Sequence, residues 1–357
     1  MKLFRTSAII ATMLVSLTAC GEKEEAKTTT EPTSNTSTSE TKPMAEEAKS
    51  NETKSTSDES KSSNKLETKF VSIATGGASG PYNIIATTLA DEYNKAYGVN
   101  SKTQTTGASI ENANLVENGK VEMAFLMSDI VSDAVKGENS FKAPVKNINQ
   151  MAVLYPNFVQ VVTSKDSGIE TLADIKGKRV SVGAPGSGTE VNARNLIQGF
   201  GMTYDDIKVD YLGYAESADA LKTGKVDVAF LTSGLPNASL LELSKSFPLK
   251  LVSIPPEKLK EIADKAPYFS SMEVPTGTYG IDKPVTTAVI RNAIIVSSKL
   301  SEDDVYKLTK TFIEKLPALQ NSHQAIKAVD AKSAQEGMVA PIHPGAKKYY
   351  DELNSKK

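Results

Sequence analysis

The sequence contains no tryptophan, one cysteine and two histidines among its 357 residues. A single cysteine forms neither an internal disulfide nor a cysteine-built zinc site, so both are excluded as stabilising features. The formal net charge is -2, with 41 Lys and Arg against 43 Asp and Glu. Because no basic excess is available to neutralise phosphates, nucleic acid is not expected as a partner.

Long apolar runs are also scarce, and the one at the start of the chain is informative. A positively charged start precedes the run AIIATMLVSLTA, which ends at Cys20. This pattern is typical of a secretory signal peptide and is too short for a stable membrane span. The residues LTAC (17–20) match the lipobox of bacterial lipoproteins, although a lone cysteine can also be a buried thiol. We predict a signal peptide over 1–19 and a lipid anchor at Cys20, on the outer face of the cytoplasmic membrane.

Apolar residues are nearly absent from the next segment, which we take as 20–66 with the lipidated cysteine included. It consists mainly of Glu, Lys, Thr, Ser and Asn. Such a composition cannot bury enough surface to offset the entropy cost of ordering. The segment is predicted to be a disordered tether, and the folded part to begin near Lys69.

Two pairs of segments in the folded part match each other at long range. VSIATGGASGPYN (71–83) resembles VSVGAPGSGTEVN (180–192), and ENGKVEMAFLMSD (117–129) resembles KTGKVDVAFLTSG (222–234). The matches occur in the same order and at similar spacing. They predict two similar lobes, in which strands alternate with helices and the sheets are parallel.

The alternation predicts particular elements in each lobe. Strands are expected at 69–75, 102–106, 121–127, 178–184, 207–212 and 226–232. Helices are expected at Tyr82–Tyr97, ending at Gly98, and at Val191–Gln198, ending at Gly199. Ser187 and Glu190 have the spacing of a capping box at the start of the second of these helices.

Each Gly/Ser-rich loop that follows a predicted strand has two interpretations. Glycine permits tight turns, so the loops can be turns alone. A helix N-terminus also offers free N–H groups that bind anions. Ligands of open α/β sheets bind at the carboxyl ends of the strands, and both loops lie there. The duplication therefore favours a ligand site shared by the two lobes.

Two β-rich segments are expected to connect the lobes. MAVLYPNFVQVVTSK (151–165) leaves the first lobe, and TAVIRNAIIVSSK (287–299) returns to it. We predict paired crossover strands that act as a hinge near Asn157 and Asn292. Lobe I then comprises 67–157 and 293–357, and lobe II comprises 158–292. Helices are predicted in three C-terminal segments: SEDDVYKLTKTFIEKL, SHQAIKAVD and GAKKYYDELNSKK.

Six motifs in order carry a resemblance to a known family. They are IATGGASGPY, TGASIENANLVENGKVEMAFLMSD, LADIKGKRVSVGAPGSGTEVNA, VDVAFLTSGLPNASLLEL, TGTYGIDKPVTT and PIHPGAKKYY. From Lys69 to Tyr350 the chain resembles the TAXI solute-binding proteins of TRAP transporters. The resemblance implies an α/β, two-lobed type II periplasmic-binding-protein-like fold, each lobe a doubly wound, mostly parallel sheet, joined by crossover strands.

The resemblance also implies a function and a set of ligand contacts. The protein would capture a small organic acid or acidic amino acid, similar to glutamate or 2-oxoglutarate, and deliver it to a TRAP membrane permease. The implied contacts are Thr75, Gly76, Gly77, Gly80, Tyr82, Gly107, Ala108, Ser109, Asn112, Ser128, Asp129, Ser187, Gly188, Thr189, Asn192, Ser233, Gly234 and Pro236. Many relatives carry an acid where this chain has Asn157, so a charged contact at the hinge is expected to be missing.

Charged side chains offer few further candidates for the site. We expect Arg179 to be solvated and Arg194 to form a surface ion pair, while Arg291 on the return crossover could reach the cleft. His343 is expected to stabilise a turn, and His323 to lie on a helix surface. No sequence motif of an enzyme, cofactor site or metal site occurs, so a non-enzyme without cofactor or metal is predicted. A surface adhesin and a receptor of another transporter type remain alternatives.

Overall fold

The computed structural model describes residues 64–356, all of which belong to one unit, Ser55–Lys357. The predicted signal peptide, Cys20 and nearly all of the tether lie outside the described residues. Within residues 64–356, no helix combines the length and the apolar character that crossing a membrane requires.

Ten strands form a single sheet in the described part of the chain. Eight of them lie in the order β2-β1-β3-β10-β4-β7-β5-β6, while β8 pairs with β4 and β9 pairs with β10. The strands are β1 (Phe70–Ala74), β2 (Asn100–Gln104), β3 (Met123–Met127), β4 (Ile148–Ser164), β5 (Arg179–Ser181), β6 (Lys208–Asp210), β7 (Val228–Ser233), β8 (Leu249–Leu251), β9 (Ser270–Val274) and β10 (Val285–Ser297).

The first half of the sheet contains three parallel strands. β1 pairs with β2 on one side and with β3 on the other. The chain passes from strand to strand through α2 (Pro81–Tyr97) and α3 (Ser109–Glu117), and α4 (Ser128–Lys136) follows β3. α2 begins at a proline and ends at Gly98, whose φ of 63° suits glycine. The end predicted for this helix is therefore confirmed.

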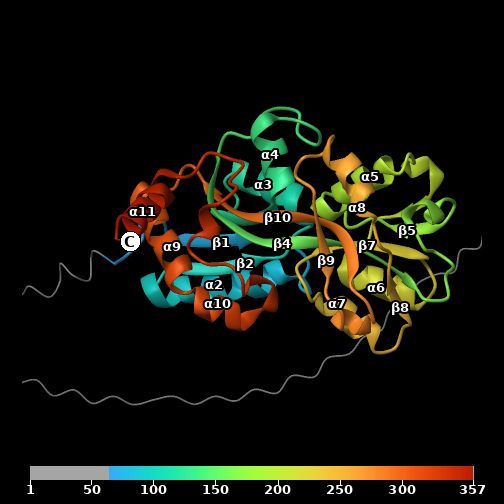
Figure 1. The fold of residues 1–357 in the computed structure, drawn as a ribbon. Coiled ribbons are helices and arrows are strands. Elements are labelled where there is room, and N and C mark those ends of the chain that lie inside the picture. Colours follow the sequence, from blue (N-terminus) through green and yellow to red (C-terminus); the bar gives the residue numbers. More distant parts are fainter. Residues whose placement is uncertain (1–63, 357) are drawn as a thin grey trace, which may run out of the picture. The chain divides into compact units, whose positions relative to one another are not determined.

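The second half repeats this arrangement with β5, β6 and β7. β5 pairs in parallel with β6 and with β7. α5 (Gly188–Gly199) follows β5, α6 (Tyr214–Lys222) follows β6, and α7 (Ala238–Ser244) follows β7. Figure 1 shows this half on the right, in yellow-green, and the blue and cyan elements of the first half on the left. The six predicted strands all exist, and β5 and β6 are shorter than their predicted ranges.

The long strands β4 and β10 run through both halves. They pair antiparallel with each other, and the register shifts between Arg291 and Ala293, so that Asn292 lies at the irregularity. β10 also pairs with β3, and β4 pairs with β7. The halves therefore share one continuous sheet. This arrangement confirms the predicted α/β fold with parallel strands in each lobe and crossover strands between them.

The apolar core is continuous on one face of the sheet and divided on the other. One cluster combines residues of both halves, such as Leu126 of β3 and Val180 of β5. On the opposite face, a cluster around Phe125 and a cluster around Leu231 are separate. Because successive strand residues point to opposite faces, Phe125 and Leu126 belong to different clusters.

The C-terminal segment returns to the first half. It contains α9 (Glu302–Glu314), α10 (Leu316–Ser322) and α11 (Pro344–Ser355). The prediction of a helix in SHQAIKAVD was wrong apart from a 3-10 turn at Gln324–Ile326. The helix lies instead in the preceding residues, where a proline occupies its first turn. The remaining elements are α8 (Pro256–Ala263) and 3-10 turns at Leu172–Ile175, Tyr204–Asp206, Thr278–Gly280 and Ser333–Gln335.

Candidate functional site

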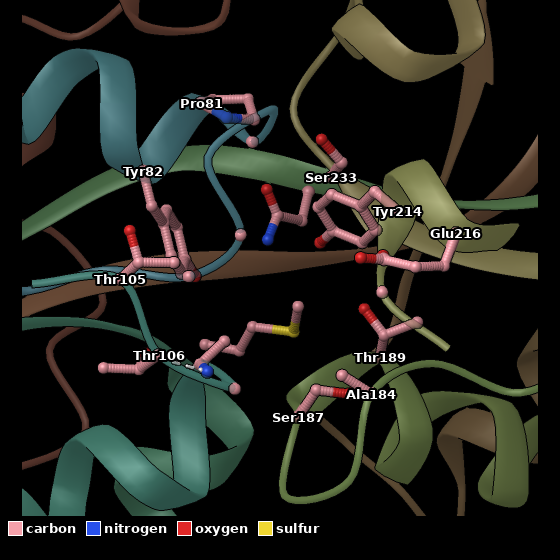
Figure 2. Close-up of a pocket in the computed structure, with 18 residues that line it drawn as sticks. Pro81, Tyr82, Thr105, Thr106, Ala184, Ser187, Thr189, Tyr214, Glu216 and Ser233 are labelled. Carbon is pink, nitrogen blue, oxygen red and sulfur yellow. Dashed lines mark hydrogen bonds between the residues drawn. The ribbon is translucent and has the colours of Figure 1, made fainter. Parts of the chain in front are cut away.

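A cavity of about 310 Å³ lies where loops of both halves meet. Its walls come from the loops after β1, β2 and β5, the start of α6 and the ends of β3 and β7. Figure 2 shows Tyr82 and Thr105 on one side of it and Thr189 and Tyr214 on the other. The loops lie at the carboxyl ends of parallel strands, which is the usual position of a ligand site in an open α/β sheet.

Half of the ligand contacts implied by the resemblance line this cavity. They are Gly76, Gly77, Gly80, Tyr82, Gly107, Ala108, Ser187, Thr189 and Ser233. Both duplicated Gly/Ser loops are represented. The duplicated loops, which are distant in the sequence, thus converge on one space.

The other implied contacts in the first half stabilise the loops from behind. The Asn112 amide donates to the carbonyl oxygens of Thr75 at 2.6 Å and Phe125 at 2.8 Å. The Ser109 hydroxyl accepts from the Met127 N–H at 3.1 Å. Thr75, Ser109 and Asn112 have no exposed surface. They hold the ends of β1 and β3 together and do not line the cavity.

Asp129 and Asn192 form a buried contact between the two halves. The Asn192 amide on α5 donates to the Asp129 carboxyl on α4 at 2.8 Å. Burial raises the pKa of Asp129 to about 7, while a hydrogen bond from the Ile130 N–H opposes that shift. The hydroxyl oxygen of neighbouring Ser128 and the side-chain oxygen of Asn192 have no partner in the described structure. These three predicted contacts lie beside the cavity, outside its lining.

Gly188, Gly234 and Pro236 also lie off the lining. A Cβ added to Gly188 would be 2.7 Å from the Met127 sulfur, and one added to Gly234 would be 2.7 Å from the Tyr155 ring. Pro236 lines a separate depression together with His323. The two glycines therefore permit close packing between elements.

Several lining residues were missed by the sequence analysis. They are Pro81, Thr105, Thr106, Met127, Ala184, Gly213, Tyr214 and Glu216, while Asn157 was expected only at the hinge. Gly213, Tyr214 and Glu216 follow β6, in another strand–glycine–helix connection. Because this connection has no hydroxyl-rich loop, the duplication did not mark it. Its place after a parallel strand is the signal that could have identified it.

A hydrogen-bonded cluster on the crossover strands supports the floor of the cavity. The Tyr82 hydroxyl donates to the Asn292 oxygen, and the Asn157 amide donates to the same oxygen at 2.9 Å. The Asn292 amide donates to the Tyr155 carbonyl at 2.8 Å. The cluster joins the start of α2 to both β4 and β10, so a lining residue is coupled directly to the predicted hinge.

The hydroxyl of Ser187 is available as a donor to a ligand. Its oxygen accepts from the Glu190 N–H at 3.1 Å, so Ser187 is the N-cap of α5 as predicted. This bond leaves its hydrogen free to donate. The reciprocal half of the predicted capping box is absent, because the Glu190 carboxylate pairs with Arg194 at 2.5 Å. The expected surface pair of Arg194 is confirmed.

The remaining arginines and histidines lie away from the lining. Arg179 pairs with Asp227 at 2.5 Å and keeps 43% of its side chain exposed, so it is solvated as expected and also forms an ion pair. Arg291 donates to the Glu336 carbonyl at 3.0 Å and does not line the cavity. The His343 ring accepts from the Gly345 N–H at the start of α11, as expected for a turn residue. His323 makes the equivalent contact to Ala325 at the end of α10 and is not simply on a helix surface.

Comparison with protein families shows which family the chain is related to. Residues 73–353 match the model of the NMT1-like family. Because this match covers most of the chain, the protein belongs to the NMT1-like family.

Similar solved structures include three with transport-related titles. The periplasmic aliphatic sulphonate binding protein SsuA from Escherichia coli is 15% identical, with 80% of this chain and 84% of that chain covered and a TM-score of 0.44. A periplasmic transporter is 13% identical, with coverage of 81% and 94% and a TM-score of 0.49. The substrate binding protein of an amino acid ABC transporter is 13% identical, with coverage of 72% and 97% and a TM-score of 0.43.

Proposed function

We propose that this protein is an extracytoplasmic solute-binding receptor that delivers a small ligand to a membrane transporter. The observation that supports this proposal is the cavity between the two halves, which both duplicated Gly/Ser loops line. A volume of about 310 Å³ is at the lower end of the range for ligand pockets, which favours a small solute. Its lining combines hydroxyls, an amide and two tyrosine rings, which suit reversible binding.

The finer assignment is a receptor of a TAXI-type TRAP transporter, anchored by a lipid at Cys20. It rests on the six motifs in order and on the lipobox, and the assigned partner is the TRAP permease. The proposed lobes are 67–157 with 293–357, and 158–292. Replacing Cys20 by Ser is expected to release the protein from membranes while its solute affinity stays unchanged. Loss of solute binding in this variant would contradict a pure tether role.

The ligand is proposed to carry a carboxylate that hydroxyl and backbone N–H donors hold. Ser187 and Thr189, at the start of α5, line the cavity, where a helix N-terminus favours negative charge. No arginine is among the 18 lining residues, so a bidentate guanidinium clamp is not part of the proposal. Each hydrogen bond to a charged group is worth about 1.5–3 kcal/mol.

A thermal-shift screen of organic acids, amino acids and sulfonates tests the proposal. A ligand present at about 100 times its dissociation constant stabilises the native state by about 2.7 kcal/mol. Compounds that raise the melting temperature would then be titrated calorimetrically against wild type and Gly80→Val. A Cβ at Gly80 already lies 3.3 Å from the Tyr214 ring, so the larger side chain should obstruct the cavity. Equal affinity in wild type and variant would place the ligand elsewhere.

A further inference from the structure

A buried carboxyl group lies at a contact between the two halves, outside the cavity. Asp129 is in the first turn of α4, in the first half, and is only 1% exposed. Asn192, on α5 of the second half, has no exposed surface and donates its amide hydrogen to the Asp129 carboxyl at 2.8 Å. Because the two residues belong to different halves, a movement that separates the halves breaks this hydrogen bond.

No cation balances a negative charge on Asp129 within residues 64–356. On α4 itself, the Ile130 N–H donates to the carboxyl at 2.8 Å, and a second acid, Asp133, lies one turn further on. The phenols of Tyr82 and of Tyr268, which hydrogen-bonds to α5, lie close enough to interact electrostatically with Asp129. Burial raises the pKa of both phenols, so they stay neutral. Burial also raises the pKa of Asp129, to about 7.

The hydrogen bonds of this contact lack one donor. An ionised Asp129 offers acceptors only, and the buried side-chain oxygen of Asn192 has no partner in the described structure. The oxygen and nitrogen of an amide exchange places by a half-turn about its terminal bond, and the turned amide accepts a hydrogen from a protonated carboxyl. A proton on Asp129 would therefore supply the donor that the buried pair lacks.

The affinity of Asp129 for a proton depends on whether the halves meet. When the halves separate, water replaces α5 beside the carboxyl, and an exposed aspartate has a pKa near 3.9. When they close, the loss of water favours the neutral form. Between these two pKa values the closed form binds more protons than the open form, so low pH favours closure. This contribution is lost as the pH rises through about 7.

We propose that Asp129 takes up a proton when the two halves close on a solute, so that solute affinity falls as the pH rises through neutrality. The inference rests on the proposed solute-binding function and adds to it a positioning residue that controls affinity from outside the cavity. In an alternative role, an ionised Asp129 stabilises the N-terminus of α4. That role predicts no proton uptake on binding.

Calorimetric titration of the full chain in buffers of different ionisation enthalpy measures the protons taken up on binding. L-glutamate and 2-oxoglutarate serve as probes, because neither changes its charge between pH 6 and pH 8. Uptake should be roughly one proton at pH 6 and about a tenth of a proton at pH 8. Over the same range the affinity should fall about 10-fold.

Asp129→Asn identifies the group that carries the proton. Asn keeps an acceptor for the Asn192 amide and has no charge at either pH, so both the uptake and the fall in affinity should disappear. Asp133→Asn is the matched control, because Asp133 is a buried acid on the same helix that receives no hydrogen bond from the second half in the described structure. It should retain both effects. Melting curves of both variants establish that they fold.

A second measurement needs no solute. In the Cys20→Ser chain, Asp91→Cys and Asp219→Cys place spin labels at exposed positions on α2 and α6, one in each half. Pulsed electron resonance of the ligand-free chain should give a shorter mean distance between the labels at pH 6 than at pH 8. With Asp129→Asn added, the distance should be the same at both pH values.

The outcomes separate this inference from the function on which it rests. Binding without proton uptake at pH 6, or uptake that persists in Asp129→Asn, overturns the proton-linked contact and leaves solute binding in place. Loss of the uptake in Asp133→Asn alone would assign the proton to the wrong acid and overturns it as well. If neither probe binds, the label distances decide, and a distance that does not change with pH overturns the inference.

Discussion

Ser187 illustrates how one side chain can serve both the fold and the proposed ligand. Its oxygen caps α5 by accepting from the Glu190 N–H at 3.1 Å, and its hydrogen is free at the cavity. A turn residue would matter only for stability, whereas a ligand contact would matter for affinity as well. The two interpretations of the Gly/Ser loop can therefore be separated at this position.

Ser187→Ala is expected to lower both stability and affinity. Loss of the cap should reduce the free energy of unfolding by about 1 kcal/mol, and loss of the donor should weaken ligand binding ~10-fold. Ser301→Ala is the control, because Ser301 caps α9 by the same contact, at 3.1 Å to the Asp304 N–H. It should lose stability alone. Wild-type affinity in the Ser187 variant would show that the loop is only a turn.

Asp129 should make stability depend on pH. Its pKa is about 7 in the fold, chiefly because it is buried, and near 3.9 in an unfolded chain. At pH values between these two pKa values, the native state binds more protons than the unfolded state. The contribution of Asp129 to stability is therefore fully present below pH about 4 and is lost as the pH rises through about 7.

Replacing Asp129 by Asn should remove that dependence. The free energy of unfolding of Asp129→Asn minus that of wild type, measured by urea unfolding, should be roughly 1–3 kcal/mol larger at pH 8 than at pH 5. Asp133, which also faces Asp129 and has a pKa raised by burial, remains in both proteins. The exposed Asp264 serves as a control when it is changed to Asn. An equal gain at both pH values would mean that Asp129 does not titrate in this range.

At the scale of elements, the loops after β2 and β5 meet closely at the edge of the cavity. The Ile110 N–H donates to the Gly186 carbonyl at 3.1 Å. A Cβ at Gly107 would lie 2.8 Å from the Pro185 carbonyl oxygen, which is a backbone atom and cannot move aside easily. Gly107 therefore permits the approach of the two halves.

Gly107→Ala is expected to hinder closure of the cavity. Ligand affinity should fall by about 10-fold or more, because the clash with a backbone atom must be relieved whenever the halves meet. Gly77→Ala is the comparison: Gly77 lines the same cavity and a Cβ there has no protein atom within 4 Å, so any loss of affinity in that variant comes from contact with the ligand and not from a clash between the halves. Titration of a validated ligand into both variants decides the matter. Unchanged affinity in Gly107→Ala would show that ligand binding does not require the close approach of these two loops.

At the scale of residues 64–356 as a whole, two features are suited to a hinge between the halves. β4 and β10 are the strands common to both halves, and Asn292 lies where their register shifts. On one face of the sheet the apolar clusters of the two halves are separate. Bending at the crossover strands would break few apolar contacts on that face, and it would separate Asp129 from Asn192.

Ligand binding is expected to close the two halves. Small-angle scattering of the chain should show a smaller radius of gyration with saturating ligand than without it, because the ligand bridges both halves. The Gly107→Ala variant at the same ligand saturation should compact less. A profile that is identical with and without ligand would exclude closure as the mechanism.

Local patterns in the sequence were sufficient to predict the alternating strands, the duplicated loops and the ends of α2. These features depend on residues close together in the chain, such as Gly98 at the end of a helix, where backbone conformation restricts the choice of residue. The placement of both Gly/Ser loops at strand ends followed from the same patterns. About half of the implied contacts did reach the cavity for that reason.

Only the tertiary structure decided which polar residues face the cavity and which lie behind it. Asn112 and Ser109 belong to the same motif as Gly107, yet they turn inward to satisfy backbone groups of β1 and β3. Tyr214 and Glu216 follow a predicted strand, but they reach the cavity only because β6 packs in parallel beside β5, which is a pairing between distant residues. Side-chain direction depends on contacts between residues that are distant in the chain, and so it is determined only when the elements pack.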